Sequence, residues 1–462
     1  MRGRIPSERH PLRAFRLSTY DRRMPEGTRN TEKRGSTRLR SLDGVRGIAA
    51  LVVVVYHVSL IARPFADGGG RAEAVWNGVT ESPLKLLFAG TEAVLVFFVL
   101  SGLVVALPLL RGTVSWPAFL ASRLVRLYVP VWGALLFAVA LIALIPRPES
   151  RVSSGEWISD ANATSVTLSS LLREASLTPA SYDIVNTLWS LRWELIFTAL
   201  LPLAIGIAVL LRRRTAALVA VGAVSVVATM LGRVLSLDAL VYLPVFLLGT
   251  LVAVRLEDIV EWAHRRPRPV LWTVGGTVSA LLLVASWIGR PLWPSGDVVS
   301  EVLWGLAGLG ALGLVLLSIC SPGVERILST RFPQWAGKVS FSLYLVHVPV
   351  LATIAFVVGD QLWWVVGLVG APLSLLISAG FFAVVERPSH RLARATGRGV
   401  GLLVDRLRGR RRVDETVSAV DAPAAAPLGG RAPRLESPHP VRTDRRSGSR
   451  SDASDRAPRS EA

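Results

Sequence analysis

Long apolar stretches recur along most of this 462-residue chain, between residues 44 and 385. Each is about 17–25 residues long, which is the length that an α-helix needs to cross a hydrocarbon core of ~30 Å. A soluble protein of this size would show amphipathic helices instead. The hydrophobic share of 51% and the mean hydropathy of +0.46 agree with this interpretation. We therefore predict an all-α integral membrane protein, a polytopic bundle of about ten transmembrane helices.

The apolar pattern divides the chain into three parts. We predict a disordered basic N-terminal tail over residues 1–38, a transmembrane domain over residues 39–392, and a basic low-complexity tail over residues 393–462. The predicted spans are 44–62, 88–110, 127–145, 194–211, 215–232, 239–255, 270–288, 300–319, 339–357 and 361–385.

The net charge of +19 resides mainly in the tails, because residues 1–46 hold 13 basic and 5 acidic residues and residues 386–462 hold 17 and 10. Basic residues beside membrane spans follow the positive-inside rule and attract anionic lipid headgroups, so we expect membrane lipids as partners and no nucleic acid. Arginine outnumbers lysine about sixteen to one, as is typical of high-GC bacterial coding. We predict a bacterial inner-membrane protein with both termini in the cytoplasm. Its inside connections, each with several basic residues, would be 111–126, 212–214, 256–269 and 320–338.

The chain has one cysteine, Cys320, which excludes an internal disulfide and a cysteine-rich metal site. We expect no metal and no bound cofactor.

Ionisable side chains inside membrane spans mark functional sites and need partners. Of six histidines, only His57 and His347 lie in predicted spans. Arg46 and His57 are eleven residues apart, so at 100° per residue they share a helix face, roughly 16 Å apart along the axis. Arg46 would lie at the cytoplasmic mouth and a neutral His57 near mid-bilayer, where it could act as a base. Alternatively, Arg46 marks the interface and His57 bonds a neighbouring helix.

His347 lies at a similar predicted depth in the ninth span, so the two histidines could face one cavity. Alternatively, His347 could bond a backbone carbonyl that Pro349 leaves without its helical partner.

Arg123 and Arg126 are three residues apart and share a helix face, which suits clamping phosphates at the cytoplasmic surface. They could equally be ordinary flanking charges. Glu194 is predicted at the outer mouth of the fourth span, orienting an acceptor hydroxyl or pairing with a histidine or with Arg192. Glu92 is an acid within or beside an apolar span and requires a partner.

Six segments of the chain resemble the acyltransferase-3 family of bacterial membrane O-acyltransferases, in the family's order and at its spacing. They are LRSLDGVRGIAALVVVVYH (39–57), AVLVFFVLSG (93–102), RLVRLYVP (123–130), LWSLRWELIF (188–197), VSFSLYLVHVPV (339–350) and VVERPSHRL (384–392). The resemblance implies a ten-helix domain that transfers an acyl group from cytoplasmic acyl-CoA, the co-substrate, to a hydroxyl.

The resemblance also implies roles for individual residues. It makes His57 the leading catalytic residue, with Glu194 and His347 as further catalytic residues, and it places Arg46, Arg123 and Arg126 at the donor. Tyr344 belongs to the same segment as His347, and we expect Asp43, Tyr344 and Glu92 to support the site. The chain departs from many relatives at Leu195, where they carry a second acid, and at Arg192, where they carry a small polar residue.

We therefore predict a membrane O-acyltransferase whose acceptor is a hydroxyl-bearing glycan, lipid or other cell-envelope or secreted metabolite. A secondary transporter or a lipid or glycan flippase would also place ionisable residues in mid-membrane, but transporters commonly show paired broken helices in two related halves. A catalytically silent membrane scaffold is the third alternative, and it would tolerate replacement of both histidines.

Overall fold

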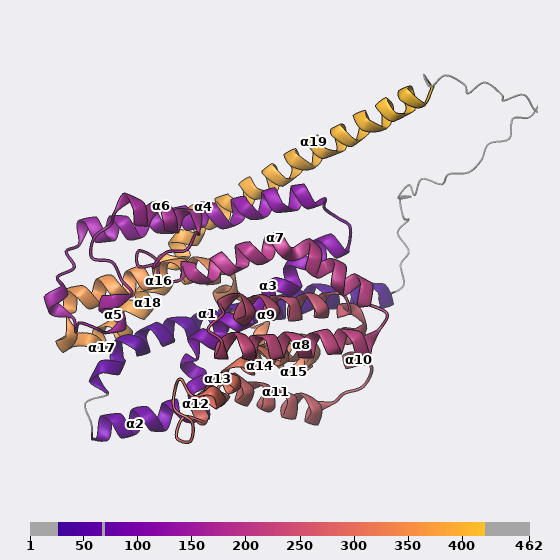
Figure 1. Ribbon diagram of the computed structural model, residues 1–462. Coiled ribbons are helices and arrows are strands. Elements are labelled where there is room, and N and C mark those ends of the chain that lie inside the picture. The colour runs from indigo at the N-terminus through magenta and orange to yellow at the C-terminus, as the bar shows by residue number, and fades with distance from the viewer. Residues whose placement is uncertain (1–25, 67–69, 421–462) are drawn as a thin grey trace, which may run out of the picture. The chain divides into compact units, whose positions relative to one another are not determined.

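The structure of the chain is a computed structural model that describes residues 26–66 and 70–420, with side chains described over 40–66 and 70–407. Every regular element in these ranges is a helix (Figure 1). This confirms the predicted all-α class. The helices that could cross a membrane belong to one compact unit, which extends to Arg406.

In the described ranges, eight helical segments are long and apolar enough to cross a membrane. A ninth is the pair α9 (Asp238–Ala253) and α10 (Leu256–Arg265), which is bent by 64° at its break. The shorter α11 (Pro269–Leu283), with α12 (Ala285–Ile288) after it, occupies the predicted span 270–288. The eight segments are α1 (Glu26–Ala62), α3 (Gly90–Leu110), α4 (Trp116–Leu144), α7 (Leu188–Leu211), α8 (Thr215–Val234), α13 with α14 (Val298–Gly305, Ala307–Cys320), α16 (Arg331–Val358) and the stretch 360–407, which contains α17 (Trp363–Val365), η5 (Val366–Gly370), α18 (Ala371–Phe381), η6 (Phe382–Glu386) and the start of α19 (Arg387–Val420).

All ten predicted spans thus coincide with helices, but several begin earlier than predicted. The helix α4 begins at Trp116, eleven residues before the predicted span 127–145, so Arg123 and Arg126 lie within a helix and not in a connection. The helices α7 and α16 also begin six and eight residues early. The extra turns of α4 and α7 carry polar side chains that line a cavity, which a hydropathy pattern does not register.

The helices also extend into the segments predicted as disordered tails. The first helix starts at Glu26, inside the predicted tail 1–38, and α19 runs to Val420, inside the predicted tail 393–462. No proline occurs between Glu26 and Ala62 or between Ser389 and Val420, and extending an existing helix adds one hydrogen bond per residue ordered. The rest of both predicted tails lies outside the described residues.

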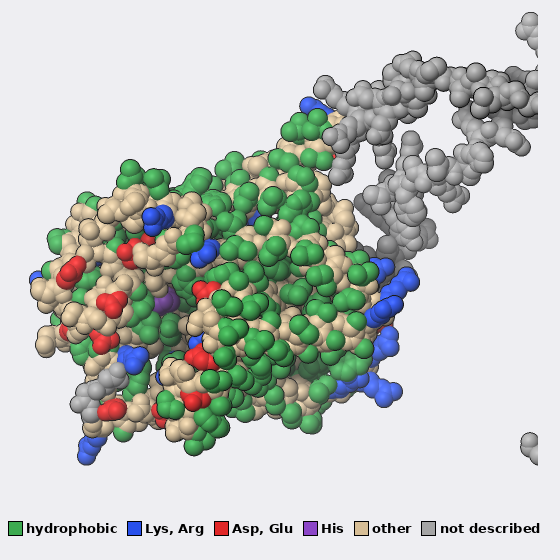
Figure 2. Space-filling view, viewed as in Figure 1, with side chains coloured by type: hydrophobic (Ala, Val, Ile, Leu, Met, Phe, Trp, Pro, Cys, Tyr) green, Lys and Arg blue, Asp and Glu red, His purple; other side chains and the backbone are tan. Residues whose placement is uncertain are grey.

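Short elements connect the membrane helices. The sign of the charged side chains differs between the two ends of this unit. Figure 2 shows Lys and Arg gathering at the end near α10, and Asp and Glu gathering over α2 (Arg71–Thr80), α5 (Trp157–Asp160) and α6 (Leu168–Ser176). Which end faces the cytoplasm stays a prediction from the positive-inside rule. The connecting elements are η1 (Arg63–Phe65), α2 (Arg71–Thr80), η2 (Pro83–Phe88), η3 (Glu149–Arg151), α5 (Trp157–Asp160), α6 (Leu168–Ser176), α15 (Pro322–Leu328) and η4 (Asp360–Leu362).

The helix α16 lies at the centre of the bundle. Within its most apolar 18-residue window, 78% of the residues are buried, whereas the corresponding share for α8 is 22%. The apolar side chains of Val219 and Val224 on α8 are exposed, as expected for a surface that contacts lipid tails. The most buried polar groups are therefore expected on α16 and on the helices packed against it.

The closest packing of α16 is against α1, and it depends on glycine. A Cβ atom at Gly337 would collide with the carbonyl oxygen of Asp43, and one at Gly47 would collide with the backbone of residues 333–337. Small residues permit such close backbone approach in membrane helices. The two helices run parallel, because Gly47 meets Gly337 in the first turns of α16 while Ile61, later in α1, joins a cluster with Leu351, later in α16.

We expect Gly337→Ala to force α1 and α16 apart, because its new methyl group has no space against the Asp43 carbonyl. Overpacking of this kind typically costs about 1–3 kcal/mol. Thermal unfolding of the detergent-solubilised protein should show a lower midpoint. The matched control is Gly380→Ala in α18, where no atom lies within 4 Å of the new Cβ. Equal midpoints for the two variants would contradict a tight α1–α16 contact.

Candidate active site

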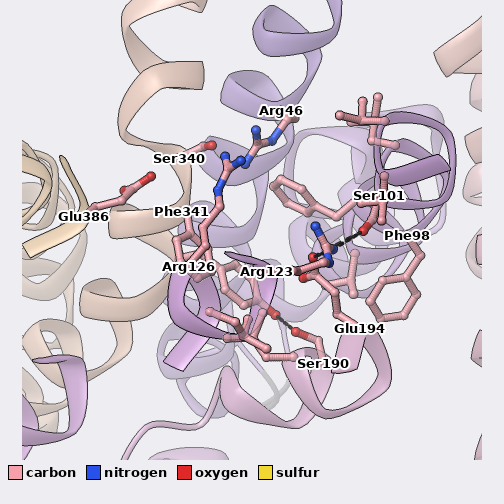
Figure 3. A pocket seen from close by; sticks show the side chains of 18 residues that line it. Arg46, Phe98, Ser101, Arg123, Arg126, Ser190, Glu194, Ser340, Phe341 and Glu386 are labelled. Atoms are coloured by element: carbon pink, nitrogen blue, oxygen red, sulfur yellow. Dashed lines mark hydrogen bonds and ion pairs between the residues drawn. The ribbon is translucent and has the colours of Figure 1, made fainter. Parts of the chain in front are cut away.

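A cavity of about 150 Å³ opens among α1, α3, α4, α7 and α16, and we call it the arginine cavity. Its lining combines an apolar floor with three arginines and two glutamates. Figure 3 shows these side chains converging on the cavity from separate helices. The charged and polar members are Arg46, Ser101, Arg123, Arg126, Ser190, Glu194, Ser340, Tyr344 and Glu386.

Arg123 is held in a network of side chains on one wall of the arginine cavity. Its guanidinium forms an ion pair with Glu194 and donates hydrogen bonds to Ser101 Oγ and Thr198 Oγ1, both at 3.0 Å. Ser101 also donates to Glu194, at 3.2 Å. The side chains of Arg123 and Glu194 are 17% and 26% exposed, so water screens the pair only in part. Both groups are thereby fixed in position before any ligand binds.

Arg46 and Arg126 differ from Arg123 in their charge partners. Figure 3 shows their side chains pointing toward one another across the cavity. Among the side chains described over 40–66 and 70–407, neither forms an ion pair. Two adjacent guanidinium groups repel each other, and an anion between them removes that repulsion. This part of the cavity therefore suits a phosphate or carboxylate ligand.

Glu386 is a member of the site that sequence reasoning missed. Its carboxylate accepts hydrogen bonds from the backbone N–H of Ser342, at 3.1 Å, and from Ser342 Oγ, at 2.5 Å. It comes from the π-helical turn η6 and is 4% exposed. An acid at the end of the apolar run FFAVV was a usable signal, since ionisable residues in membrane spans require partners.

A second cavity, of about 90 Å³, contains His57, and we call it the histidine cavity. Aromatic rings surround the imidazole, with the Trp157 ring centroid 5.2 Å from that of His57. The hydroxyl of Thr187 is buried and has no hydrogen-bond partner within the described residues. The lining is Val53, Tyr56, His57, Leu60, Gly90, Thr91, Val94, Trp157, Asn186, Thr187, Trp189 and Tyr344.

The two membrane histidines are in direct contact. His57 Nδ1 lies 2.9 Å from the carbonyl oxygen of Val53 and 3.1 Å from His347 Nε2. His347 Nδ1 lies 2.7 Å from the carbonyl oxygen of Leu343. Because carbonyl oxygens only accept, we assign a proton to Nδ1 of each ring. The single His57 Nδ1 proton is then shared between the carbonyl oxygen of Val53 and His347 Nε2, and Nε2 of His57 keeps its lone pair.

Tyr344 and Val94 line both cavities and lie between them. The Tyr344 hydroxyl is 2.6 Å from Ser190 Oγ, and Ser190 Oγ donates to the carbonyl oxygen of Thr187, at 3.1 Å. Since the single proton of Ser190 is directed to Thr187, Tyr344 is the donor in the first bond. A chain of hydrogen bonds thus ties α16 to α7 at the boundary between the cavities.

The structure brings most of the predicted site residues together, with three differences. Glu194 does not lie at an outer mouth with a histidine or Arg192; it is six residues inside α7 and paired with Arg123 in the arginine cavity. Glu92 is fully buried but lines neither cavity, and it accepts from Trp287 Nε1 at 2.8 Å. Asp43 is exposed and lines neither cavity.

The segment before α7 is anchored by a buried acid. The Glu174 carboxylate accepts hydrogen bonds from the backbone N–H groups of Ile184, at 3.0 Å, and Val185, at 3.1 Å. Burial raises the pKa of Glu174 to about 7, although these two bonds act in the opposite direction. Asn186 and Thr187, which line the histidine cavity, directly follow the anchored pair.

Among the described residues, no group of three or more His, Cys, Asp or Glu side chains is placed to hold a metal ion.

The fold and these cavities define a polytopic helical membrane protein with a buried polar site. The chain matches the model of the acyltransferase-3 family, described as an acyltransferase domain, over residues 39–383. The match covers about three quarters of the chain and includes every lining residue of both cavities except Glu386, so the chain belongs to this family and is a membrane acyltransferase. No curated protein and no solved structure matched it.

We expect the ion pair of Arg123 and Glu194 to stabilise the bundle by joining α4 to α7. Arg123→Ala or Glu194→Ala should each cost about 1–3 kcal/mol, because the remaining charge is left partly buried without its partner. The double variant should lose less than the sum of the two single losses. Thermal unfolding of all four proteins in one detergent measures this coupling. Strict additivity would show that the two side chains do not interact.

Proposed function

We propose that this protein is an O-acyltransferase that moves an acyl group from cytoplasmic acyl-CoA to a hydroxyl group of a cell-envelope glycan, a lipid or a secreted metabolite. The observation that carries the proposal is the contact between two unlike cavities. One is lined by arginines and the other by a histidine with a free ring nitrogen, and they meet at Tyr344 and Val94.

The donor would bind in the arginine cavity. The guanidinium groups of Arg46 and Arg126, which form no ion pair with the described side chains, suit bidentate contacts with CoA phosphates. Arg123 is already paired with Glu194. We therefore propose that it mainly holds the cavity wall in shape and only secondarily contacts the ligand. Arg46 and His57 lie roughly 16 Å apart along α1, a distance that the pantetheine arm would bridge.

In the proposed reaction, the acceptor hydroxyl enters the histidine cavity. Its oxygen attacks the thioester carbonyl carbon while Nε2 of His57 takes its proton. The tetrahedral intermediate then collapses, the carbon–sulfur bond breaks, and the CoA thiolate takes the proton back from the imidazolium. The products are an ester and CoA with a free thiol, so no further reactant is required. Positioned general-base catalysis of this kind typically contributes about 10²–10⁴-fold.

His347 would act through His57 and not on the substrate. It is fully buried, it lies outside the lining of both cavities, and its Nε2 accepts the Nδ1 proton of His57. That bond holds His57 in the tautomer whose Nε2 is basic, and it stabilises the imidazolium formed when the hydroxyl proton is taken. We therefore assign His347 as a positioning residue for the base.

Transport is the less well supported alternative. Paired broken helices in two related halves are typical of secondary transporters. The described part of the chain contains a single bent pair, α9 with α10, and that pair contributes no residue to either cavity.

The first test concerns the base. Membranes containing wild type, His57→Ala or His57→Gln are supplied with labelled acetyl-CoA and cell-envelope extract. We expect transfer to fall by about 10²–10⁴-fold in both variants at equal protein levels. Binding of labelled CoA should remain, since the arginine cavity is unchanged. Near-normal turnover in either variant would refute the assignment of His57, and the absence of any CoA-dependent transfer in wild type would refute the proposed function.

The second test concerns His347. His347→Gln replaces the accepting ring nitrogen with an amide oxygen that can also accept from His57 Nδ1, whereas His347→Ala removes the acceptor. We expect kcat to fall by at least about tenfold in the alanine variant and to recover in large part in the glutamine variant, with KM for acyl-CoA unchanged in both. A loss shared equally by both variants, or one confined to KM, would contradict a positioning role.

A further inference from the structure

We propose that Val94 and Tyr344 form a septum that receives the thioester and selects the length of the transferred acyl group, in favour of short acyl groups. This inference rests on the proposed function and adds to it the class of acyl donor. It depends on where the two cavities meet, on how Tyr344 is held there, and on the size of the histidine cavity.

Val94 from α3 and Tyr344 from α16 are the two residues that contribute to the lining of both cavities. They are 4% and 7% exposed, so little of either surface is open. Phe97, one turn along α3 from Val94, lies on the arginine side with its ring centroid 6.0 Å from that of Tyr344. An isopropyl group and a phenol ring therefore separate the donor side from His57.

Tyr344 is held in this position and is not free to swing. Its hydroxyl donates to Ser190 Oγ at 2.6 Å, and Ser190 donates in turn to the carbonyl oxygen of Thr187. Both hydroxyl protons are thus used, and the ring is fixed between α16 and α7. Moving the ring breaks its bond to Ser190, and Ser190 cannot follow the ring without losing its own bond to Thr187, which makes the septum a defined boundary.

The chemistry requires the thioester carbonyl to lie at this boundary. The phosphate-binding arginines are on one side, the base is on the other, and the reacting atoms must come within about 3–3.5 Å. An acyl group at that position points past Val94 into the histidine cavity. This cavity has a volume of about 90 Å³ and must also admit the acceptor hydroxyl. Little room remains for a long hydrocarbon chain.

The experiment measures transfer from saturated acyl-CoA donors of two to eight carbons to cell-envelope extract, for wild type and Val94→Ala. One methylene in an apolar pocket is worth about 10–200-fold in specificity. We expect wild type to favour the shortest donors, and Val94→Ala to raise the butyryl-to-acetyl ratio of kcat/KM by at least about tenfold. Val94→Leu should lower that ratio.

Two valines provide controls with the same change in side-chain volume. Val96 and Val99 lie on the same helix as Val94, are buried, and line neither cavity. Neither Val96→Ala nor Val99→Ala should alter the butyryl-to-acetyl ratio. A general loosening of the bundle would shift the ratio in all three alanine variants and would contradict a role specific to the septum.

A second measurement tests the hydrogen bonds that hold the ring. Tyr344→Phe removes the donor to Ser190 while keeping the ring. We expect the ratio of acyl-CoA hydrolysis, measured without acceptor, to acyl transfer to rise several-fold, because water enters past a ring that can move. An unchanged ratio would show that the hydroxyl does not hold the barrier.

The outcomes distinguish a failure of the septum proposal from a failure of the proposed acyltransferase activity. Transfer that occurs in wild type but shows the same chain-length profile in Val94→Ala and Val94→Leu overturns the septum and leaves the acyltransferase in place. An absence of CoA-dependent transfer in wild type with every donor overturns both.

Discussion

The site depends on one contact, the approach of α1 to α16 at Gly47 and Gly337. The two helices are parallel, and each carries its histidine ten residues beyond its glycine. At 1.5 Å per residue both histidines therefore lie about 15 Å beyond the crossing point, and they meet there. The equal glycine-to-histidine spacing in two parallel helices therefore brings the two histidines together, which no local sequence motif could do. It places His57 and His347 within hydrogen-bond distance although 290 residues separate them in the chain.

The membrane spans could be predicted from sequence because the bilayer imposes a length and an apolar composition on each helix. All ten appeared as helices. Their starts were less accurate, as α4 shows. A hydropathy pattern ends where charge begins, yet the helix continues through Arg123 and Arg126 because their charges face a polar cavity. Lipid sets the apolar part of a helix, whereas a protein-lined cavity supports the polar part.

The histidines and arginines of the site could be proposed from their position in or beside apolar spans, but their partners could not. Glu194 was expected near a histidine or Arg192 and is paired with Arg123, from a helix 71 residues away in sequence. Glu386 was passed over, although it lies between Ser342 and the arginine cavity. Which side chains pair depends on which helices pack together and on how each helix is rotated about its axis. Neither can be read from a local stretch of a single sequence.

The hydrogen-bonded Tyr344 has a consequence for the membrane itself. A bundle hollowed toward both faces would conduct ions if its two hollows joined, and a conducting path would discharge the gradients that the membrane stores. At the junction stand an isopropyl group and a phenol ring whose only proton is already donated to Ser190. An ion that passed between these two side chains would lose much of its hydration shell, which is costly in an apolar passage. The septum that we propose from Val94 and Tyr344 would therefore also keep the two cavities from joining into a path for ions.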